Sequence, residues 1–217
     1  MFMTVPPSID VDRLVATSLT SAAELEAVLG VPHPNILDKH RTFTTPLVRT
    51  FVSMARFFVL ATSDADGNCD SSPRGDIEST VLFPDDRTVV IPDRPGNRRA
   101  DSYRNILDNP HVGIMFLVPG VDEVVRINGR ATLTVDPDML QQMSIGSRPA
   151  QLGLVVRVDE VYVHCARAVL RSKVFEPQTW PDTDGVPTLR EMSDELHGIT
   201  EVSTEPKRSE DYRTALY

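Results

Sequence analysis

The sequence has 217 residues, a length that suits one sizeable domain or at most two small ones. Its hydrophobic share of 41% and charged share of 24% are ordinary for a globular protein, and its formal net charge of -9 argues against a general nucleic-acid-binding surface, which is usually basic. The two cysteines form no disulfide framework, and no signal-peptide pattern opens the chain. The longest strongly apolar run (57–61) is too short for the roughly 20 residues of a membrane span. We therefore expect a cytoplasmic protein with no membrane segment.

Residues 1–50 are predicted to form a helical N-terminal extension. The run TSAAELEAVLG opens with a capping box, in which Thr20 or Ser21 precedes Glu24, and it ends at Gly30. Residues 1–30 hold no motif residue, so we expect them to be accessory to any functional site.

From residue 51 the pattern changes to that of strands. The apolar runs RFFVLATS and HVGIMFLVP predict strands that are buried on both faces. DADGN predicts a hairpin turn in which Gly67 takes a positive φ, and CDSSPRGD is the returning strand, stopped by Pro73. STVLF and TVVIP predict a second hairpin.

A helix is predicted directly after that hairpin. Asn97 is a suitable N-cap, and RRADSYRNILDN has helix-compatible apolar positions at Ala100, Tyr103 and Leu107. The pair Asn109-Pro110 ends the pattern.

The remaining strands show clear alternation. VVRINGRATLTV places Val125, Ile127, Gly129, Ala131 and Leu133 on one face, and Arg126, Asn128, Arg130 and Thr132 on the other. LGLVVRVDEVYVHC changes parity at Asp159-Glu160, which predicts a bulge or bend. Between these strands, Asp136 and Pro137 predict the start of a short helix, and LREMSDELHG predicts a peripheral helix near the end.

Together these segments predict a mainly β fold with accessory helices, in which about six antiparallel strands close into a barrel. We expect one structural domain overall, divided into the N-terminal helical extension 1–50, the barrel 51–175 and a peripheral C-terminal segment 176–217.

Four arginines gather in the stretch PDRPGNRRADSYRN, against two aspartates (Asp93 and Asp101), although the chain as a whole is acidic; they are Arg94, Arg98, Arg99 and Arg104. They could form a solvated helix face with weak surface pairs. They could also bind an anion, because the first helical turn offers free N–H groups and the positive end of the dipole, where cations are otherwise unfavourable.

SSPRGD is a second candidate for an anion or flat-ring site. Ser72 and Arg74 supply a hydroxyl and a guanidinium, and Gly75 lets a ligand approach the backbone. Taken alone, a plain turn with a salt bridge at Asp76 is the more frequent meaning of this pattern.

Four motifs taken together resemble the pyridoxamine 5'-phosphate oxidase-like flavoproteins, closest to a bacterial subgroup without a settled substrate. They are FFVLATSDADGNCDSSPRGD, VVIPDRPGNRRADSYRNILDNPHVGIMFLVPG, EVVRINGRATLTVD and VYVHCARAVLRS, and the resemblance covers residues 35–190. It implies an antiparallel six-stranded split β-barrel of the FMN-binding type. It also implies a homodimer with FMN in a cleft between the subunits.

The resemblance also implies functional residues, position by position. In that family, residues of the second strand and of the segment after the fourth strand hold the FMN phosphate. The cofactor-binding candidates are Ser72, Arg74, Gly75, Arg94, Asn97, Arg98, Arg99, Ser102, Arg126, Arg171 and Ser172. His164 and Arg167 are the catalytic candidates. The subgroup usually has Lys where this chain has Arg167, so a planar guanidinium with several N–H donors stands here in place of a compact ammonium group. Taken on its own, His164 is more often a structural histidine.

The sequence therefore favours an FMN-dependent oxidoreductase that acts on an unknown small-molecule substrate. The oxidase's own substrate-binding residues do not map cleanly, so pyridoxine chemistry is not carried over. One alternative is a non-catalytic split barrel that binds flavin or haem, and another is a stress or regulatory protein whose dimer matters more than its chemistry. We find no metal-site motif.

Overall fold

The computed structural model describes residues 9–199, without the side chains of residues 36 and 37. The chain divides by its internal contacts into two units, Met1–Lys39 and His40–Tyr217. The parts of the predicted terminal segments that span residues 1–8 and 200–217 lie outside the described residues.

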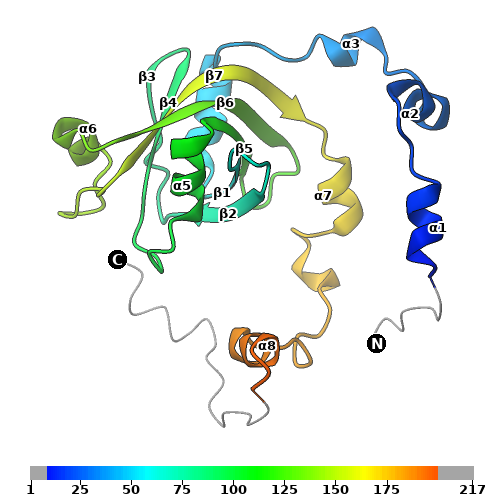
Figure 1. The fold of residues 1–217 in the computed structure, drawn as a ribbon. Coiled ribbons are helices and arrows are strands. Elements are labelled where there is room, and N and C mark those ends of the chain that lie inside the picture. Colours follow the sequence, from blue (N-terminus) through cyan, green and yellow to red (C-terminus); the bar gives the residue numbers. More distant parts are fainter. Residues whose placement is uncertain (1–8, 200–217) are drawn as a thin grey trace. The chain divides into compact units, whose positions relative to one another are not determined.

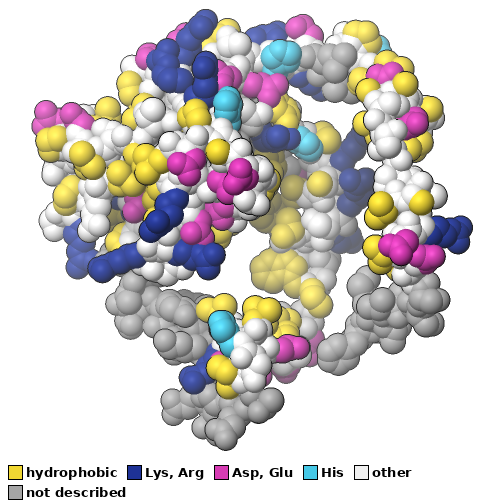
Figure 2. Space-filling model, in the orientation of Figure 1, with side chains coloured by type: hydrophobic (Ala, Val, Ile, Leu, Met, Phe, Trp, Pro, Cys, Tyr) yellow, Lys and Arg dark blue, Asp and Glu magenta, His cyan; other side chains and the backbone are white. Residues whose placement is uncertain are grey.

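The first unit contains three short helices, α1 (Val11–Ala16), α2 (Ala22–Leu29) and α3 (Pro34–Leu37). The capping box of α2 is confirmed, because the Ser21 side chain accepts from the backbone N–H of Glu24 while the Glu24 carboxylate accepts from that of Ser21. No residue of α1 or α2 is buried, and Figure 2 shows hydrophobic side chains on their surface.

The second unit is built on one antiparallel sheet in the order β2-β1-β5-β6-β7-β4-β3 (Figure 1). Its strands are β1 (Phe57–Ser63), β2 (Cys69–Gly75), β3 (Leu82–Asp85), β4 (Thr88–Pro92), β5 (His111–Leu117), β6 (Val124–Thr134) and β7 (Gly153–His164). The helices are α4 (Pro46–Met54), α5 (Asp101–Asp108), α6 (Pro137–Gln142), α7 (Arg167–Ser172), the 3₁₀ helix η1 (Pro177–Thr179) and α8 (Leu189–Leu196). The predicted mainly β class is confirmed, with seven strands among the described residues where six were expected. The sheet is not closed, with β2 and β3 at its ends, whereas a closed barrel was expected.

The main core lies on one face of the sheet, and a smaller buried cluster lies on the other face of β4; it consists of Val90, Leu140, Met143 and Ala150. In β1 and β5 buried residues such as Leu60 and Phe116 alternate with exposed ones. Phe57 is 42% exposed and Met115 is 38% exposed. The expectation that these strands are buried on both faces is therefore wrong for this chain, because their second face carries apolar side chains that nothing in the described chain covers. α4 closes part of the core with the fully buried Val52.

The predicted bulge in β7 is confirmed. Asn128 of β6 pairs with Glu160, whereas Gly129 pairs with Val158, so Asp159 is an extra residue in the ladder. A Cβ atom at position 129 would lie 2.1 Å from the backbone oxygen of Arg157. The two backbones approach so closely at the bulge that only glycine fits there.

α5 starts later than predicted. The N-cap residue is Ala100, which has a φ of 59° and makes no side-chain cap. Asn97 instead accepts from the backbone N–H of Arg99 at 3.0 Å, so it closes a turn in the preceding loop and does not cap the helix. The helix buries Ser102 and Ile106, and the predicted apolar contact Leu107 is 74% exposed.

The peripheral helices follow their predicted signals. Asp136 caps α6 by accepting from the N–H of Met139, and Thr188 opens a capping box with Glu191 in α8. Across residues 9–199, no helix is both long enough and apolar enough to cross a membrane.

Candidate functional site

A pocket of about 920 Å³ lies at the edge of the sheet, between β2, the loop of residues 92–100 and the start of α5. It brings together eight of the sequence-predicted site residues. These are Ser72, Arg74, Gly75, Arg94, Asn97, Arg98, Arg99 and Ser102. Charges of both signs lie beside one another on the surface over α5 (Figure 2).

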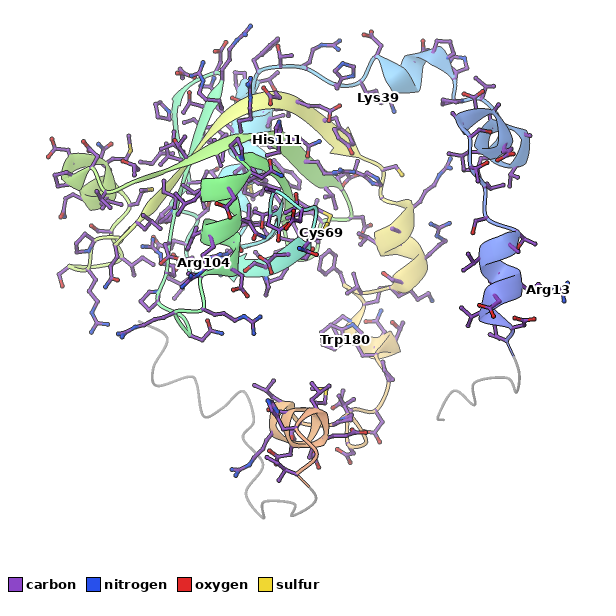
Figure 3. The ribbon with its side chains drawn as sticks, in the orientation of Figure 1. Arg13, Lys39, Cys69, Arg104, His111 and Trp180 are labelled. Carbon is purple, nitrogen blue, oxygen red and sulfur yellow. The ribbon has the colours of Figure 1, made fainter. Side chains whose placement is uncertain are left out.

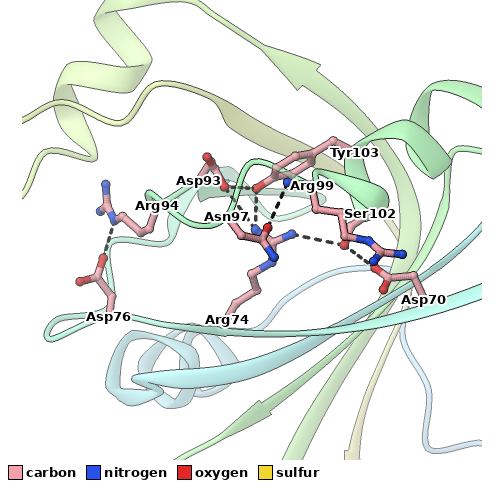
Figure 4. A network of polar contacts seen from close by, with 9 residues as sticks. All are labelled: Asp70, Arg74, Asp76, Asp93, Arg94, Asn97, Arg99, Ser102 and Tyr103. Atoms are coloured by element: carbon pink, nitrogen blue, oxygen red, sulfur yellow. Dashed lines mark hydrogen bonds and ion pairs between the residues drawn. The ribbon is translucent and has the colours of Figure 1, made fainter. Parts of the chain in front are cut away.

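Arg74 is the centre of the polar network in this pocket (Figure 4). Its Nη1 donates to Asp93 at 3.2 Å and to the Tyr103 hydroxyl at 2.8 Å, and its Nη2 donates to Ser102 at 3.3 Å. The guanidinium also lies 4.8 Å from the centre of the Tyr103 ring, a cation–π distance. Its Nε is buried and has no hydrogen-bond partner among the described residues.

Tyr103 fixes the orientation of Arg74 and Asp93. Its hydroxyl accepts from Arg74 and donates to Asp93. Burial and the hydrogen bond to Asp93 raise the pKa of Tyr103 above its ordinary value of 10.0. The phenol therefore stays protonated at neutral pH and acts as a fixed neutral donor.

Ser102 links the strand and the helix. Its hydroxyl donates to Asp70 at 2.5 Å, and the residue is only 2% exposed. Because half-buried residues alternate with exposed ones along β2, Asp70, Ser72 and Arg74 lie on the same covered face of the strand.

Arg94, another predicted cofactor-binding residue, uses its Nε and Nη2 donors within the fold. Its Nε donates to Asp76 at 2.5 Å, and its Nη2 donates to Thr80 at 2.7 Å and to the carbonyl of Met143 at 2.9 Å. The side chains of Arg94 and Asp76 are 15% and 12% exposed. Arg94 therefore ties together three chain segments beside the pocket.

The loop before α5 is strained and rich in cations. Arg98 and Ala100 both have positive φ values, 61° and 59°, which are uncommon for residues other than glycine. Arg99 forms an exposed ion pair with Asp101, and Arg98 makes no ion pair with any described residue. Because no side chain caps α5, its first N–H groups are open to an anion.

Gly75 lines the pocket, but local packing also explains it. A Cβ atom at this position would lie 3.2 Å from the backbone oxygen of Arg56, a contact tighter than side chains normally make. A small residue is therefore favoured here by the approach of the chain before β1, with or without a ligand.

The other predicted residues lie away from this pocket. Arg126 is half-buried on β6, with its guanidinium 4.8 Å from the centre of the Tyr162 ring. His164 ends β7, with Nδ1 3.1 Å from the carbonyl oxygen of Cys165. Three exposed residues belong to α7: Arg167, Arg171 and Ser172. The structure of one chain does not bring these residues together with the pocket.

The second unit also contains a free thiol and an indole. Cys69 lies at the start of β2 and is a free, exposed thiol, and Trp180 follows η1 (Figure 3). The Trp180 indole N–H donates to the carbonyl of Val174 at 3.1 Å, a hydrogen bond within the segment that follows α7.

Sequence reasoning missed the acidic half of the pocket. Asp70, Asp93 and Asp101 line it, as does Tyr103, which was predicted only as an apolar helix position. One signal was available in the sequence. Asp70 stands two residues before Ser72 and four before Arg74, so strand alternation alone places it on the same face.

Comparison with known families gives a match over most of this unit. A family model described as pyridoxamine 5'-phosphate oxidase matches residues 44–180, well over half of the chain. Among curated proteins, none matches the sequence.

Several solved structures are similar to the chain. HupZ from Group A Streptococcus is 18% identical, with a TM-score of 0.43 over 54% of this chain and 91% of that one. An FMN-binding protein from Syntrophomonas wolfei subsp. wolfei is 15% identical, with a TM-score of 0.41 over 65% of this chain and 97% of that one. The heme storage protein HutZ from Vibrio cholerae is 14% identical, with a TM-score of 0.38 over 55% and 92%.

Proposed function

Since the chain belongs to the pyridoxamine 5'-phosphate oxidase family, we propose that its pocket binds FMN and that the protein is an FMN-dependent oxidoreductase acting on a small molecule. The observation that carries this proposal is the set of anion-binding groups at one end of the pocket. Arg98, Arg99 and the uncapped start of α5 all lie there.

These groups fit a phosphate in charge and in geometry. A guanidinium binds phosphate through two donors at once, and a helix start adds backbone N–H groups and a favourable dipole. Arg99 can exchange its ion pair with Asp101 for a contact with a ligand at a small cost in free energy, because exposed ion pairs contribute less than about 1 kcal/mol to stability.

The pocket of a single chain fits haem less well. Haem iron needs an axial His, Cys, Met or Tyr, and among the residues that line this pocket only Tyr103 belongs to that group. Its hydroxyl is occupied by Arg74 and Asp93, and its raised pKa opposes the phenolate that iron would bind. Bound FMN would supply a ring that accepts and returns two electrons, whereas the protein supplies binding and orientation.

We further propose that the protein is a cytoplasmic homodimer with the cofactor at the subunit interface. The uncovered apolar face of β1 and β5 supports the dimer. The proposed catalytic residues, His164 and Arg167, lie outside the pocket of their own chain, and so do Arg171 and Ser172. In this proposal these residues act from the second subunit.

Titration with FMN and with riboflavin, which lacks the phosphate, tests the cofactor proposal. Arg99→Ala should weaken FMN binding roughly 10- to 100-fold, the value of one charge-assisted hydrogen bond, and should leave riboflavin binding unchanged. Arg104→Ala is the matched control, because this exposed arginine of α5 is not among the residues that line the pocket. Flavin fluorescence quenching measures the affinities of both flavins for the native protein and the two variants.

Equal losses of FMN and riboflavin in Arg99→Ala would assign Arg99 to the ring or to the fold. A native protein that binds neither flavin would refute the cofactor proposal. Reduction of the bound flavin by a nicotinamide donor, followed by its reoxidation, separates an oxidoreductase from a flavin-storage protein.

A further inference from the structure

Four aspartates line the pocket, and three of them face an arginine. Asp93 pairs with Arg74, Asp76 with Arg94 and Asp101 with Arg99. The fourth, Asp70, forms no ion pair with any described residue.

The position of Asp70 is fixed by the strand and the helix together. It lies on the covered face of β2, in one row with Ser72 and Arg74. One carboxylate oxygen, Oδ2, accepts from the Ser102 hydroxyl at 2.5 Å, and Ser102 is almost fully buried. The other oxygen, Oδ1, makes no hydrogen bond within the described chain and belongs to a pocket-lining residue.

We propose that Asp70 binds the hydroxyl groups of the ligand's polyol chain and thereby selects a phosphate ester whose neighbouring carbons carry free hydroxyls. The inference rests on the proposed function and adds a residue that determines cofactor specificity. An ionised carboxylate only accepts hydrogen bonds, so its partner on the ligand must be a donor.

The charges around Asp70 decide which kind of donor fits. Five arginines line the pocket, and they disfavour a ligand ammonium group; they are Arg56, Arg74, Arg94, Arg98 and Arg99. Asp70 itself disfavours a second anion at its own position. Neutral hydroxyl groups satisfy both conditions, and the ribityl chain of FMN carries several of them next to the phosphate.

The Ser72 side chain extends this polar row. Strand residues on one face repeat at about 6.8 Å, so Ser72 lies midway between Asp70 and Arg74. A hydroxyl can donate or accept, and Ser72 can therefore serve the next hydroxyl of an extended polyol.

Three flavins separate the subsites. FMN has a phosphate and a polyol, riboflavin has only the polyol, and lumiflavin has neither. Asp70→Ala should weaken riboflavin binding roughly 10-fold and leave lumiflavin binding unchanged. It should weaken FMN binding by a smaller factor, because the carboxylate that repels the phosphate is lost as well. Fluorescence quenching of the three ligands gives the affinities, and circular dichroism confirms that the variant is folded.

Two further variants keep the test decisive. Asp70→Asn removes the charge but retains an acceptor oxygen, so it should lose less riboflavin affinity than Asp70→Ala. Asp101→Asn is the matched control, because it removes the same charge from the pocket at a residue that pairs with Arg99. It should change the affinity for FMN without changing the affinity for riboflavin.

Two results would overturn the role of Asp70. Tighter FMN binding with unaltered riboflavin binding in both Asp70 variants would show that Asp70 only repels the phosphate. An equal loss for all three flavins would make it a structural partner of Ser102. A native protein that binds none of the flavins would instead refute the proposed cofactor, and this inference would fall with it.

Discussion

Arg74 and Arg126 project from opposite faces of one sheet. Arg74 is in register with Phe58, which is in register with Phe116, and both phenylalanines are buried in the core. Arg126 is in register with the exposed Met115, one residue along the ladder. Because strand side chains alternate, the two arginines cannot both reach a ligand in the pocket of a single chain.

Arg126→Ala should therefore leave the ratio of FMN to riboflavin affinity as it is in the native protein. If the second subunit places Arg126 near the flavin ring, both affinities fall together, because both ligands carry the ring. Fluorescence titration of the two flavins measures the ratio. A selective loss of FMN would show that Arg126 contacts the phosphate.

Arg94→Ala should destabilise the protein by about 2–4 kcal/mol, because it removes three hydrogen bonds and leaves the buried carboxylate of Asp76 without this cation. Urea unfolding followed by circular dichroism measures the change. Arg99→Ala is the control, since its pair with Asp101 is exposed and should contribute less than about 1 kcal/mol. An unfolding free energy of Arg94→Ala equal to that of the native protein would contradict this structural role.

Local signals explain which parts of this structure the sequence predicted. The Asp159 bulge follows from a change of parity within one strand. The cap at Ser21 follows from Glu24 three positions later, and the cap at Asp136 follows from the adjacent Pro137. The start of α5 did not follow, because Asn97 closes a turn of its own and tertiary contacts with β2 fix Ser102 instead.

The candidate site shows the same division. Alternation along β2 was sufficient to place Ser72 and Arg74 together, and the Arg98-Arg99 cluster lies beside them as the family pattern implied. The aspartates that pair with the arginines come from separate segments, so only the fold shows the pairing. The side of the sheet that carries Arg126 depends on the register of four strands, which no single strand pattern contains.

Gly129→Ala should reduce the free energy of unfolding by at least about 3 kcal/mol or prevent folding, because the added Cβ would lie 2.1 Å from the backbone oxygen of Arg157. The neighbouring atom is backbone within the β6–β7 ladder, so it cannot move away easily. Gly185→Ala is the control, since a Cβ added there would meet no atom within 4 Å. Thermal unfolding of both variants gives the comparison, and equal melting temperatures would contradict the close approach.

Ionisation of Tyr103 should lower the free energy of unfolding at alkaline pH. Its pKa is raised in the folded state by burial and by Asp93, so the unfolded chain loses this proton first as the pH increases. The contribution of Tyr103 to the free energy of unfolding is complete below about pH 10. Above that pH it is lost, by at most about 1.4 kcal/mol per pH unit. Urea unfolding between pH 8 and pH 11 should show a steeper decline for the native protein than for Tyr103→Phe, with Tyr162→Phe as the control. Equal declines in the native protein and Tyr103→Phe would be inconsistent with the raised pKa.

Met115→Glu should convert the proposed dimer into a monomer. Met115 and Phe57 lie on the uncovered apolar face of β1 and β5, and an obligate interface buries more than roughly 2,000 Å² in total, with few charges at its centre. A carboxylate placed there would be buried without a partner. Leu107→Glu, which changes an exposed apolar residue of α5, should leave the mass unchanged. Light scattering at micromolar concentration measures both masses, and flavin titration then shows whether the monomer also loses its cofactor, as a shared site requires. A monomeric native protein would refute the dimer and would leave His164 and Arg167 without a route to the flavin.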